Sequence, residues 1–286
     1  MAARLKIAVQ KSGRLLDGSL RILRECGIKV DNGKDQLKAR SSNFPIDILY
    51  LRNSDIPQYI EDGVADVAII GENTLIEKDK EIEKILPLGF SKCRLSIALP
   101  KNTDYTGPQD LNGKRIATSY PHSLQMFLER KGVSAHIHEI SGSVEIAPNI
   151  GLADAICDLV STGSTLFKNG LEEKEIILRS EAWLVSRKGM SKELVSIFDT
   201  MVFRINSVLS ARQNKYLLMN APNESIEKII RILPGMKSPT VMPLATKGWS
   251  SIHTVIQEDS FWEIIDKLKG AGGEGILIIP IEKMIL

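Results

Sequence analysis

One short run of small polar residues is the part of this chain best suited to hold a charged ligand. The apolar residues 155–160 predict a buried strand, and the run that follows is Ser161, Thr162, Gly163, Ser164 and Thr165. Gly163 permits a positive φ and a close approach of the backbone to a ligand. Backbone N–H groups and hydroxyls in such a turn can converge on one phosphate. A polar turn that only closes the strand is the alternative, and spacing alone leaves both interpretations open.

Charged side chains beside this turn and after the first predicted strand suit an anionic ligand. Asp154 and Asp158 could accept hydrogen bonds from ribose hydroxyls or complete the oxygen shell of a magnesium ion. Lys11 and Arg14 follow the strand at residues 5–9, and Arg14 could hold a phosphate through two hydrogen bonds. Two solvated charges in a turn are the alternative there. Other candidates recur at strand ends: Arg52, Asp55, Gly71, Glu72, Asn73, Thr118, Ser119 and Tyr120, whose ring could lie against a purine or only cap a helix.

Other kinds of site find no support in the sequence. The four histidines show no metal-ligand spacing, and no Ser-His-Asp set with a nucleophile-elbow pattern is present. The usual dinucleotide-binding and Walker fingerprints are absent as well. The three cysteines are isolated in apolar segments, which suits reduced core thiols and offers neither a disulfide nor a zinc site.

The composition is that of an ordinary globular protein without a strong charge bias. The chain has 286 residues, of which 43% are hydrophobic, and its 37 basic and 35 acidic side chains are mixed along the sequence. This balance provides no basic stripe for a nucleic-acid backbone, so nucleic acid is not an expected partner. No leader pattern and no apolar run long enough to span a bilayer are evident, and we expect no membrane association and a cytoplasmic location.

Alternating strand and helix patterns predict an α/β fold with two lobes. The first lobe is predicted as strand 5–9, helix 19–26, strand 46–51, helix 55–61 and strand 64–70. The second lobe is predicted as strands 94–99, 114–118, 136–139 and 155–160 with a helix at 124–131, before a return strand at 183–186 and a long helix through 194–209. Such connections are typical of parallel crossover units. Because open parallel sheets bind ligands at the carboxyl ends of their strands, we expect a ligand between the lobes.

The tail has a different pattern. Strands are predicted at 216–220, 240–244, 252–256 and 276–280, and helices at 225–233 and 261–269. The resulting order, βαββαβ, is typical of small ferredoxin-like modules, which often bind effectors at an interface. Trp249, Phe261 and Trp262 are expected to be core or interface aromatics rather than part of a ligand site.

The residues around the small polar turn closely resemble a known family signature. The run Gly151-Leu-Ala-Asp-Ala-Ile-Cys-Asp-Leu-Val-Ser-Thr-Gly-Ser-Thr-Leu166, with Glu145 upstream, is similar to the signature of ATP phosphoribosyltransferase, the first enzyme of histidine biosynthesis. Further blocks agree: Gln10-Lys-Ser-Gly-Arg14, Asp55-Ile-Pro57, Asp66-Val-Ala-Ile-Ile-Gly-Glu-Asn73, Lys114-Arg-Ile-Ala-Thr-Ser-Tyr-Pro-His122 and Pro280-Ile-Glu-Lys-Met284. The resemblance covers essentially the whole chain, including the tail, which looks like the regulatory module of the long form.

The resemblance implies an α/β fold with two periplasmic-binding-protein-like lobes and a C-terminal ferredoxin-like regulatory domain. The implied boundaries are 1–93 with 184–210 for catalytic lobe I, 94–183 for lobe II with the phosphoribosyl pyrophosphate loop, and 211–286 for the regulatory domain. It also implies feedback inhibition by histidine, a homo-oligomer that passes from dimer to hexamer, and no need for a separate regulatory subunit.

The reaction that the resemblance implies transfers the phosphoribosyl group of phosphoribosyl pyrophosphate to N1 of ATP, with pyrophosphate as the other product and Mg2+ as cofactor. The residues implied for phosphoribosyl pyrophosphate are Lys11, Glu145, Asp154, Asp158, Ser161, Thr162, Gly163, Ser164 and Thr165. Those implied for ATP are Arg14, Arg52, Gly71, Glu72, Asn73 and Tyr120, and those for histidine are Asn220, Thr240, Val255 and Gly275. The protein ligands of the magnesium ion stay unknown, and we expect the ion to be bridged by substrate phosphates.

A non-enzymatic two-lobed binding protein or sensor is the alternative function. The same architecture serves solute binding, and a fold does not by itself determine function. Such a protein would not need a hydroxyl-rich phosphate loop, two cations after the first strand and an effector-type tail together. The combination therefore favours the phosphoribosyl-transferring enzyme.

Overall fold

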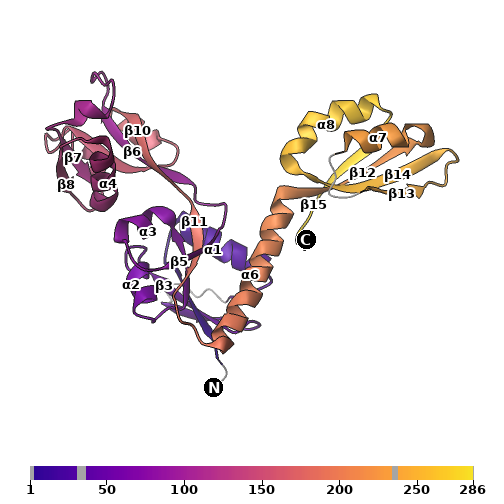
Figure 1. Ribbon diagram of the computed structural model, residues 1–286, viewed down its shortest axis with the longest axis horizontal. Helices are drawn as coiled ribbons and strands as arrows, with labels where there is room; N and C mark the ends of the chain where they lie inside the picture. Colours follow the sequence, from indigo (N-terminus) through magenta and orange to yellow (C-terminus); the bar gives the residue numbers. More distant parts are fainter. Residues whose placement is uncertain (1–2, 31–36, 234–237, 286) are drawn as a thin grey trace. The chain divides into compact units, whose positions relative to one another are not determined.

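The computed structural model describes residues 3–30, 37–233 and 238–285 of the chain (Figure 1). The chain folds as two compact units. One unit holds Met1–Arg24 and Ile28–Phe198, and the other holds Glu25–Gly27 and Asp199–Leu286. The first unit contains two sheets and the candidate site, and the second contains the third sheet.

The first sheet belongs to an α/β lobe. Its strands are β1 (Leu5–Gln10), β2 (Lys38–Arg40), β3 (Ile46–Leu51), β4 (Val67–Gly71), β5 (Glu83–Pro87) and β11 (Ala182–Ser186), in the order β2-β3-β1-β4-β11-β5. Strands β1, β3 and β4 are parallel, whereas β11 runs antiparallel to both neighbours. The helices of this lobe are α1 (Arg14–Glu25), α2 (Ile56–Glu61) and α3 (Glu72–Lys78). Every residue of β4 is buried, as expected for an apolar strand covered on both faces.

A second α/β lobe carries the run of small polar residues. Its strands are β6 (Cys93–Pro100), β7 (Arg115–Thr118), β8 (His136–Glu139), β9 (Ala155–Val160) and β10 (Leu171–Ser180), in the order β10-β6-β9-β7-β8. Its helices are η1 (Pro108–Leu111), α4 (Pro121–Lys131), η2 (Val144–Ile146) and α5 (Ser164–Lys168). Strands β9, β7 and β8 are parallel neighbours, so their carboxyl ends share one edge of the sheet. This edge is where ligands of open α/β sheets bind.

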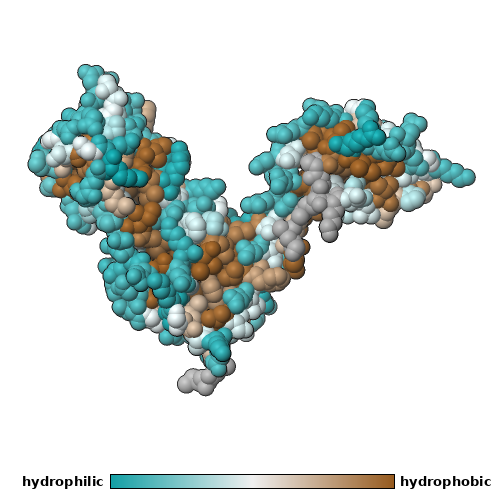
Figure 2. All heavy atoms as spheres, in the orientation of Figure 1, coloured by the Kyte–Doolittle hydropathy of each residue, from teal (hydrophilic) through white to brown (hydrophobic). Residues whose placement is uncertain are grey.

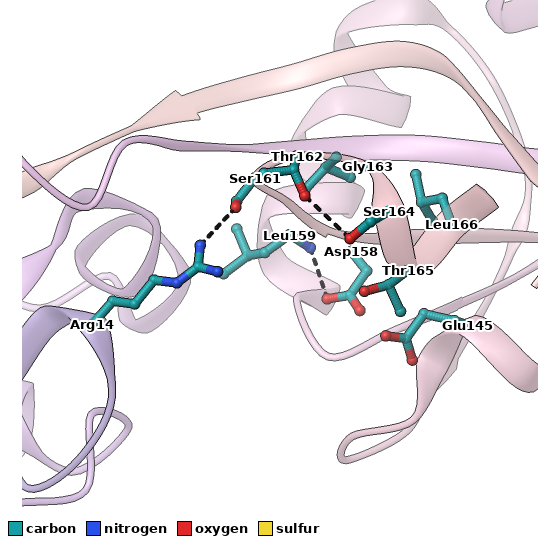
Figure 3. Close-up of a pocket in the computed structure, with 11 residues that line it drawn as sticks. Arg14, Glu145, Asp158, Leu159, Ser161, Thr162, Gly163, Ser164, Thr165 and Leu166 are labelled. Carbon is teal, nitrogen blue, oxygen red and sulfur yellow. Dashed lines mark hydrogen bonds between the residues drawn. The ribbon is translucent and has the colours of Figure 1, made fainter. Parts of the chain in front are cut away.

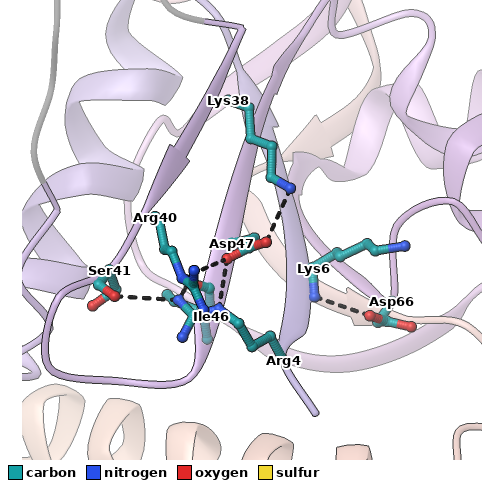
Figure 4. Close-up of polar contacts among 8 residues, drawn as sticks. All are labelled: Arg4, Lys6, Lys38, Arg40, Ser41, Ile46, Asp47 and Asp66. Carbon is teal, nitrogen blue, oxygen red and sulfur yellow. Dashed lines mark hydrogen bonds and ion pairs between the residues drawn. The ribbon is translucent and has the colours of Figure 1, made fainter. Parts of the chain in front are cut away.

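Paired charges hold the amino ends of the strands in the first lobe (Figure 4). Asp47 at the start of β3 accepts a hydrogen bond from Arg4 at 2.7 Å and pairs with Lys38 of β2 at 3.0 Å. Burial acts to raise the pKa of Asp47, but the bonds from Arg4 and Lys38 outweigh it and hold the pKa below its ordinary value. Asp66, just before β4, accepts a hydrogen bond from the backbone N–H of Lys6 at 2.9 Å. Both carboxylates are therefore hydrogen-bonded at the end of the sheet opposite to the carboxyl ends of the parallel strands.

The second unit contains a four-stranded antiparallel sheet that follows the long helix α6 (Lys192–Gln213). Its strands are β12 (Asn214–Pro222), β13 (Thr240–Pro243), β14 (Trp249–Gln257) and β15 (Glu274–Pro280), in the order β13-β14-β12-β15. Its helices are η3 (Asn223–Ser225), α7 (Ile226–Ile232) and α8 (Glu258–Gly270). Leu217, Met219 and Ile252 of the sheet form a core with Ile229 of α7 and Leu268 of α8, so both helices cover the same face.

Helix α6 departs from one expectation. Among the described residues it is long and apolar enough to cross a membrane by length and composition, whereas the sequence pattern predicts no such run. Core helices of proteins in water pass the same test. Helix α6 buries Phe198, Met201, Ile205, Val208 and Ala211, whereas its Val195 and Phe203 are exposed. Figure 2 shows hydrophobic patches set among hydrophilic residues on the visible face of the chain.

Most predicted elements are present, with shifted ends. The α/β class and the βαββαβ order of the tail are confirmed, and β9 matches its predicted range. Helix α1 begins at Arg14 rather than at residue 19, which makes Arg14 a helical residue. Strands β2, β5 and β10 and helix α3 are not predicted, because they are short or polar. The three cysteines are free, and Trp262 is 74% exposed, so a core role is wrong for that tryptophan.

Candidate functional site

The loop after β9 lines a pocket of about 220 Å³ (Figure 3). Gly163 has φ +80° and ψ 0°, a left-handed conformation that favours glycine, and it precedes the first residue of α5. Ser164 and Thr165 open that helix, so their N–H groups have no acceptor within it. The hydroxyls of Thr162 and Ser164 lie 3.2 Å apart within the turn. The whole run from Ser161 to Thr165 lines the pocket and provides a group of hydrogen-bond donors there.

Two arginines hold Ser161, the first residue of this run. Arg14 donates from Nη1 to Ser161 Oγ at 3.0 Å, so the first lobe reaches the loop of the second (Figure 3). Arg94, at the start of β6, donates from Nη1 to the Ser161 carbonyl oxygen at 3.2 Å. Glu173 of β10 accepts hydrogen bonds from Nε and Nη2 of Arg94, which raises the pKa of Arg94 and lowers the pKa of Glu173. Sequence reasoning missed Arg94 and Glu173, because only the pairing of β6 with β10 brings them together.

Two carboxylates line the same pocket, Asp158 from β9 and Glu145 from η2. Burial raises the pKa of Asp158 to about 6. The Leu159 N–H, which donates to Asp158 Oδ1 at 2.7 Å, lowers the pKa, and the charge of Glu145 raises it. Asp158 therefore exchanges its proton much closer to neutral pH than an ordinary aspartate does. A carboxyl with a raised pKa inside a polar pocket is a candidate functional group.

A second pocket, of about 450 Å³, lies at the carboxyl ends of β7 and β8, the strands next to β9 in the sheet. Its lining comes from both lobes and includes Asn53, Thr74, Glu77, Tyr120, Glu139 and Gly142. The sequence analysis predicted a ligand contact for Tyr120 alone among these six. The two pockets therefore stand at one edge of one sheet, as a reaction between two bound molecules requires.

Tyr120 forms a hydrogen bond with the side chain of Asn73. Burial is the main cause that raises the pKa of the Tyr120 hydroxyl, with a further contribution from the charge of Asp158, while a hydrogen bond with the Asn73 side chain lowers it. Asn73 is also bonded to Ser180, whose hydroxyl lies 3.0 Å from the Asn73 N–H and from Oδ1. Asn73 is only 4% exposed and lines neither pocket, so its contact in this structure is with Tyr120, and its ligand contact stays a prediction.

The structure contradicts the site predicted for Asp154. This residue precedes β9, whereas the small polar run follows it, and a strand of six residues is about 20 Å long. Arg115 donates to Asp154 from its backbone N–H at 2.8 Å and from Nη2 at 2.9 Å. These hydrogen bonds lower the pKa of Asp154 to about 2. Asp154 is thus an ion-pair partner at the far end of the strand and is not a sugar ligand.

Four further predicted residues, Lys11, Arg52, Gly71 and Glu72, line neither of these pockets. Lys11 and Arg52 are exposed in adjacent loops, because the Lys11 N–H donates to the carbonyl of the residue before Arg52 at 2.8 Å. Glu72 forms an ion pair with Lys84 at 2.8 Å. At Gly71 a Cβ atom would lie 2.5 Å from the side-chain oxygen of the asparagine that supports Tyr120. The ligand contacts of these four residues stay predictions.

The residues predicted for an effector share one face of the sheet in the second unit: Asn220, Thr240, Val255 and Gly275. Leu217 and Met219 face the helices, so Asn220, one residue further along β12, faces the other way. Across the sheet, Asn220 pairs with Ser251 and Thr240 pairs with His253. We call this surface the open face, because α7 and α8 cover only the opposite face.

A hydrogen-bonded group that sequence reasoning missed lies on the open face. The Tyr216 hydroxyl is 2.9 Å from His253 Nδ1, and Ser251 Oγ is 2.9 Å from His253 Nε2. Gly275 has φ +56°, and a Cβ atom there would lie 3.6 Å from the Asn220 side-chain nitrogen. The open face therefore offers polar groups, and Gly275 of β15 brings its backbone close to the Asn220 side chain of β12.

Carboxylates in the first pocket are too few to form a complete metal site. Over residues 3–30, 37–233 and 238–285, no group of three or more His, Cys, Asp or Glu side chains is placed to hold a metal ion. A divalent ion at Asp158 and Glu145 would need further oxygen ligands from a bound molecule or from water.

Comparisons with known proteins point to one family along most of the chain. A family model described as ATP phosphoribosyltransferase matches residues 52–207, and one described as HisG, C-terminal domain matches residues 211–283. The ATP phosphoribosyltransferase of Cytophaga hutchinsonii is 54% identical over 285 residues, which covers 100% of both chains.

Solved structures show the same likeness. A chain of the ATP phosphoribosyl transferase (HisG:HisZ) complex from Thermotoga maritima has a TM-score of 0.60 and 29% identity, over 71% of this chain and 98% of that chain. The substrate binding protein of an amino acid ABC transporter has a TM-score of 0.50 and 13% identity, over 73% of this chain and 95% of that chain, which bears on the fold alone. The predicted two-lobed, binding-protein-like architecture is thereby confirmed.

Proposed function

Since the chain belongs to the ATP phosphoribosyltransferase family, we propose that the pocket after β9 binds phosphoribosyl pyrophosphate and that the pocket at the ends of β7 and β8 binds ATP. The chain catalyses the first step of histidine biosynthesis, in which the phosphoribosyl group passes to N1 of ATP and pyrophosphate leaves. Family membership sets aside the non-enzymatic sensor as an alternative. One observation carries the assignment of the first pocket: a left-handed glycine turn, an arginine and two carboxylates line it together.

In the first pocket, the run from Ser161 to Thr165 holds the 5-phosphate of the sugar. Its N–H groups and hydroxyls are donors, and hydrogen bonds to an ionised acceptor are about twice as strong as neutral ones. Arg14, already bonded to Ser161, brings a positive charge to the same place. Asp158 accepts hydrogen bonds from the ribose hydroxyls when it is ionised. The sugar is then fixed at both ends, and its anomeric carbon is turned toward the second pocket.

The chemistry needs positioning and charge stabilisation more than a protein nucleophile. Adenine N1 has a free lone pair and forms the new bond to the anomeric carbon as the bond to pyrophosphate breaks. Positive charge develops on the sugar ring and negative charge on the departing pyrophosphate. Asp158 stabilises the positive charge on the sugar ring, and Arg14 stabilises the negative charge on pyrophosphate. Tyr120 orients the adenine base. We expect no covalent intermediate with the enzyme.

We also propose magnesium as the cofactor. Asp158 and Glu145 fit it, because both are hard oxygen donors in the pocket assigned to phosphoribosyl pyrophosphate. When bound, the ion would neutralise charge on the pyrophosphate group and so assist its departure. Substrate phosphates and water would supply the remaining ligands, since Asp158 and Glu145 alone are too few for a complete site.

The assignment of the first pocket is tested by replacing Thr165 with alanine. We expect the KM for phosphoribosyl pyrophosphate to rise roughly tenfold or more, because the variant loses a hydrogen bond to a charged group. The KM for ATP should change little. Steady-state kinetics measure both constants, and Thr246→Ala, an exposed threonine of the second unit, is the control. An unchanged KM for phosphoribosyl pyrophosphate in Thr165→Ala would count against the assignment.

For the open face we propose feedback inhibition by histidine. The polar residues there, Asn220, Thr240, Ser251 and His253, suit an amino acid with charged ends and a hydrogen-bonding ring. Such a site is separate from both substrate pockets, which lie in the other unit.

Replacing Thr240 with valine, which keeps the shape and removes the hydroxyl, should weaken this inhibition. We expect the half-inhibiting histidine concentration to rise roughly threefold or more, with kcat unchanged. The matched control is Thr254→Val, since Thr254 is buried and alternates onto the opposite face of β14. Inhibition of equal strength in Thr240→Val and the parent enzyme would rule out this residue as part of the site.

We further propose that the chain is a cytoplasmic homo-oligomer that passes from dimer to hexamer. The open face supports association, because Leu277 is 53% exposed and Ile279 is 42% exposed there. Light scattering after size-exclusion chromatography should give a dimer without histidine and a hexamer with it. A monomer under both conditions would contradict the proposal.

A further inference from the structure

Gly18 lies inside α1, where glycine is an unfavourable residue. Glycine in a helix interior is less favourable than alanine, because it loses more backbone freedom on folding. A Cβ atom on Gly18 would lie 2.3 Å from both Cδ2 and Cε2 of Phe90 and 3.1 Å from its Cγ. The aromatic ring of Phe90 therefore lies directly against the helix backbone, and any side chain at position 18 would displace one of the two.

Phe90 belongs to the connection that leads from β5 to β6, between the two lobes. Its neighbours Gly89 and Ser91 have φ +74° and +53°, and a serine in this conformation costs energy that surrounding contacts must offset. The Phe90 carbonyl accepts a hydrogen bond from the N–H of Ala182 at 3.0 Å, at the start of β11. The Gly89 N–H donates to a carboxylate oxygen of Glu181 at 3.0 Å. Phe90 is thus anchored where the two connections between the lobes pair with each other.

The helix that Phe90 contacts also carries Arg14. One helical turn separates Gly18 from Arg14, so both residues are on the same side of α1. Arg14 is the first residue of the helix, and its 3.0 Å hydrogen bond to Ser161 Oγ joins it to the phosphate-binding loop. Because hydrogen bonds weaken steeply beyond their normal range, a shift of the helix at Gly18 would weaken this contact.

We propose that Gly18 and Phe90 are positioning residues for the phosphoribosyl pyrophosphate pocket. The Phe90 ring determines how closely α1 packs against the connection between the lobes. This position of α1 in turn determines whether Arg14 reaches Ser161 and the substrate phosphates. Neither Gly18 nor Phe90 lines the pocket, so both act through Arg14. The inference rests on the proposed function of that pocket.

The first measurement compares the same substitution at two helical glycines. Gly18→Ala is expected to raise the KM for phosphoribosyl pyrophosphate roughly tenfold, the effect of losing one hydrogen bond to a charged group. The KM for ATP should stay within about twofold. Gly270→Ala in α8 is the control, because a Cβ atom there meets nothing within 4 Å, and its kinetics should equal those of the parent. A folded Gly18→Ala variant with an unchanged KM for phosphoribosyl pyrophosphate would overturn the proposal.

Two combined variants separate positioning from a general loss of structure. In an Arg14→Ala background, Gly18→Ala should raise this KM no further, whereas a second rise of equal size would show that Gly18 does not act through Arg14. Adding Phe90→Leu to Gly18→Ala makes room for the new methyl group, and the KM should return to within roughly threefold of the parent. If the KM of this double variant stayed high, the Phe90 ring would not be the group that the new methyl group displaces.

The same series distinguishes failure of this inference from failure of the pocket assignment. If Arg14→Ala alone leaves the KM for phosphoribosyl pyrophosphate unchanged, the pocket itself is misassigned. If Gly18→Ala does not fold, Phe90→Ala with and without Arg14→Ala makes the same comparison, because the truncated ring no longer supports α1. Thermal unfolding of each variant accompanies the kinetics.

Discussion

Replacing Asp158 with asparagine is expected to remove most of the activity and yet to stabilise the folded chain at pH 8. We expect kcat/KM to fall roughly a hundredfold or more, because the variant loses the charge that we propose to stabilise the developing sugar cation. Burial raises the pKa of Asp158 to about 6, so the folded chain disfavours the ionised form. Without that ionised group, the free energy of unfolding at pH 8 should rise by about 1 to 3 kcal/mol. Steady-state kinetics and thermal unfolding measure the two effects.

The gain in stability should depend on pH in one direction. The pKa of Asp158 is 3.8 in its ordinary state and about 6 in the folded chain. Between these values the unfolded chain has released a proton that the folded chain keeps, so the parent protein loses stability as the pH rises and levels off above about pH 6. The advantage of Asp158→Asn grows over the same interval. In the parent enzyme, kcat/KM should rise through about pH 6 as Asp158 ionises.

Asp154→Asn is the matched control at the other end of β9. Hydrogen bonds from Arg115 lower the pKa of Asp154 to about 2, so here the folded chain favours the charged form. This variant should be slightly less stable at pH 8, by less than about 1 kcal/mol for a pair this exposed, with an unchanged KM for phosphoribosyl pyrophosphate. Normal activity in Asp158→Asn, or a loss of stability at pH 8, would contradict the role assigned to Asp158.

Replacing Gly163 with alanine should disable the turn that we propose to bind the 5-phosphate. Gly163 has φ +80°, and a non-glycine residue in the left-handed region costs about 1–2 kcal/mol. A Cβ atom at this position would lie 4.0 Å from Val160 Cγ1, so the effect comes from backbone strain and not from a clash. We expect the turn to relax to a negative φ, its donors to diverge, and the KM for phosphoribosyl pyrophosphate to rise roughly tenfold or more.

Gly170→Ala provides the comparison for this strain. Gly170 follows α5, has φ +70° and does not line the first pocket. A Cβ atom added to Gly170 would meet nothing within 4 Å. Both alanine variants should lose similar thermal stability, and only Gly163→Ala should lose affinity for phosphoribosyl pyrophosphate. Equal kinetic constants in the two variants would mean that the turn does not hold the phosphate.

Local pattern is sufficient for the elements that are uniformly apolar or regularly alternating. Strand β9 is apolar at every position except Asp158, and its predicted and observed ranges coincide. The strands of the tail keep their order for the same reason. Strand β10 (Leu171–Ser180) is missed because it is rich in charged residues and two irregularities interrupt its pairing with β6. Only the pairing of β10 with β6 shows what one of these charges does: Glu173 accepts hydrogen bonds from Arg94.

Some site residues could be predicted from the sequence, and the positions of others depend on the tertiary structure. The turn from Ser161 to Thr165 and the carboxylate of Asp158 were predicted from spacing, and the structure brings both into one pocket. Asp154 was predicted with them because it is near in sequence. The strand β9 lies between Asp154 and the turn, however, so the two are about one strand length apart. Asn73 was predicted as a ligand because it follows a strand, and only the tertiary structure shows that it is buried and forms a hydrogen bond with Tyr120.

By itself the sequence determined the α/β class and the small polar turn after β9, because those depend on residue types within a few positions of one another, and its resemblance to a known family indicated the reaction. Tertiary structure alone decided which groups act together: Arg14 with Ser161 across the two lobes, Arg94 with Glu173 across two strands, and Phe90 against Gly18. It also decided the pKa of Asp158, since desolvation depends on what covers a carboxyl and not on its neighbours along the chain.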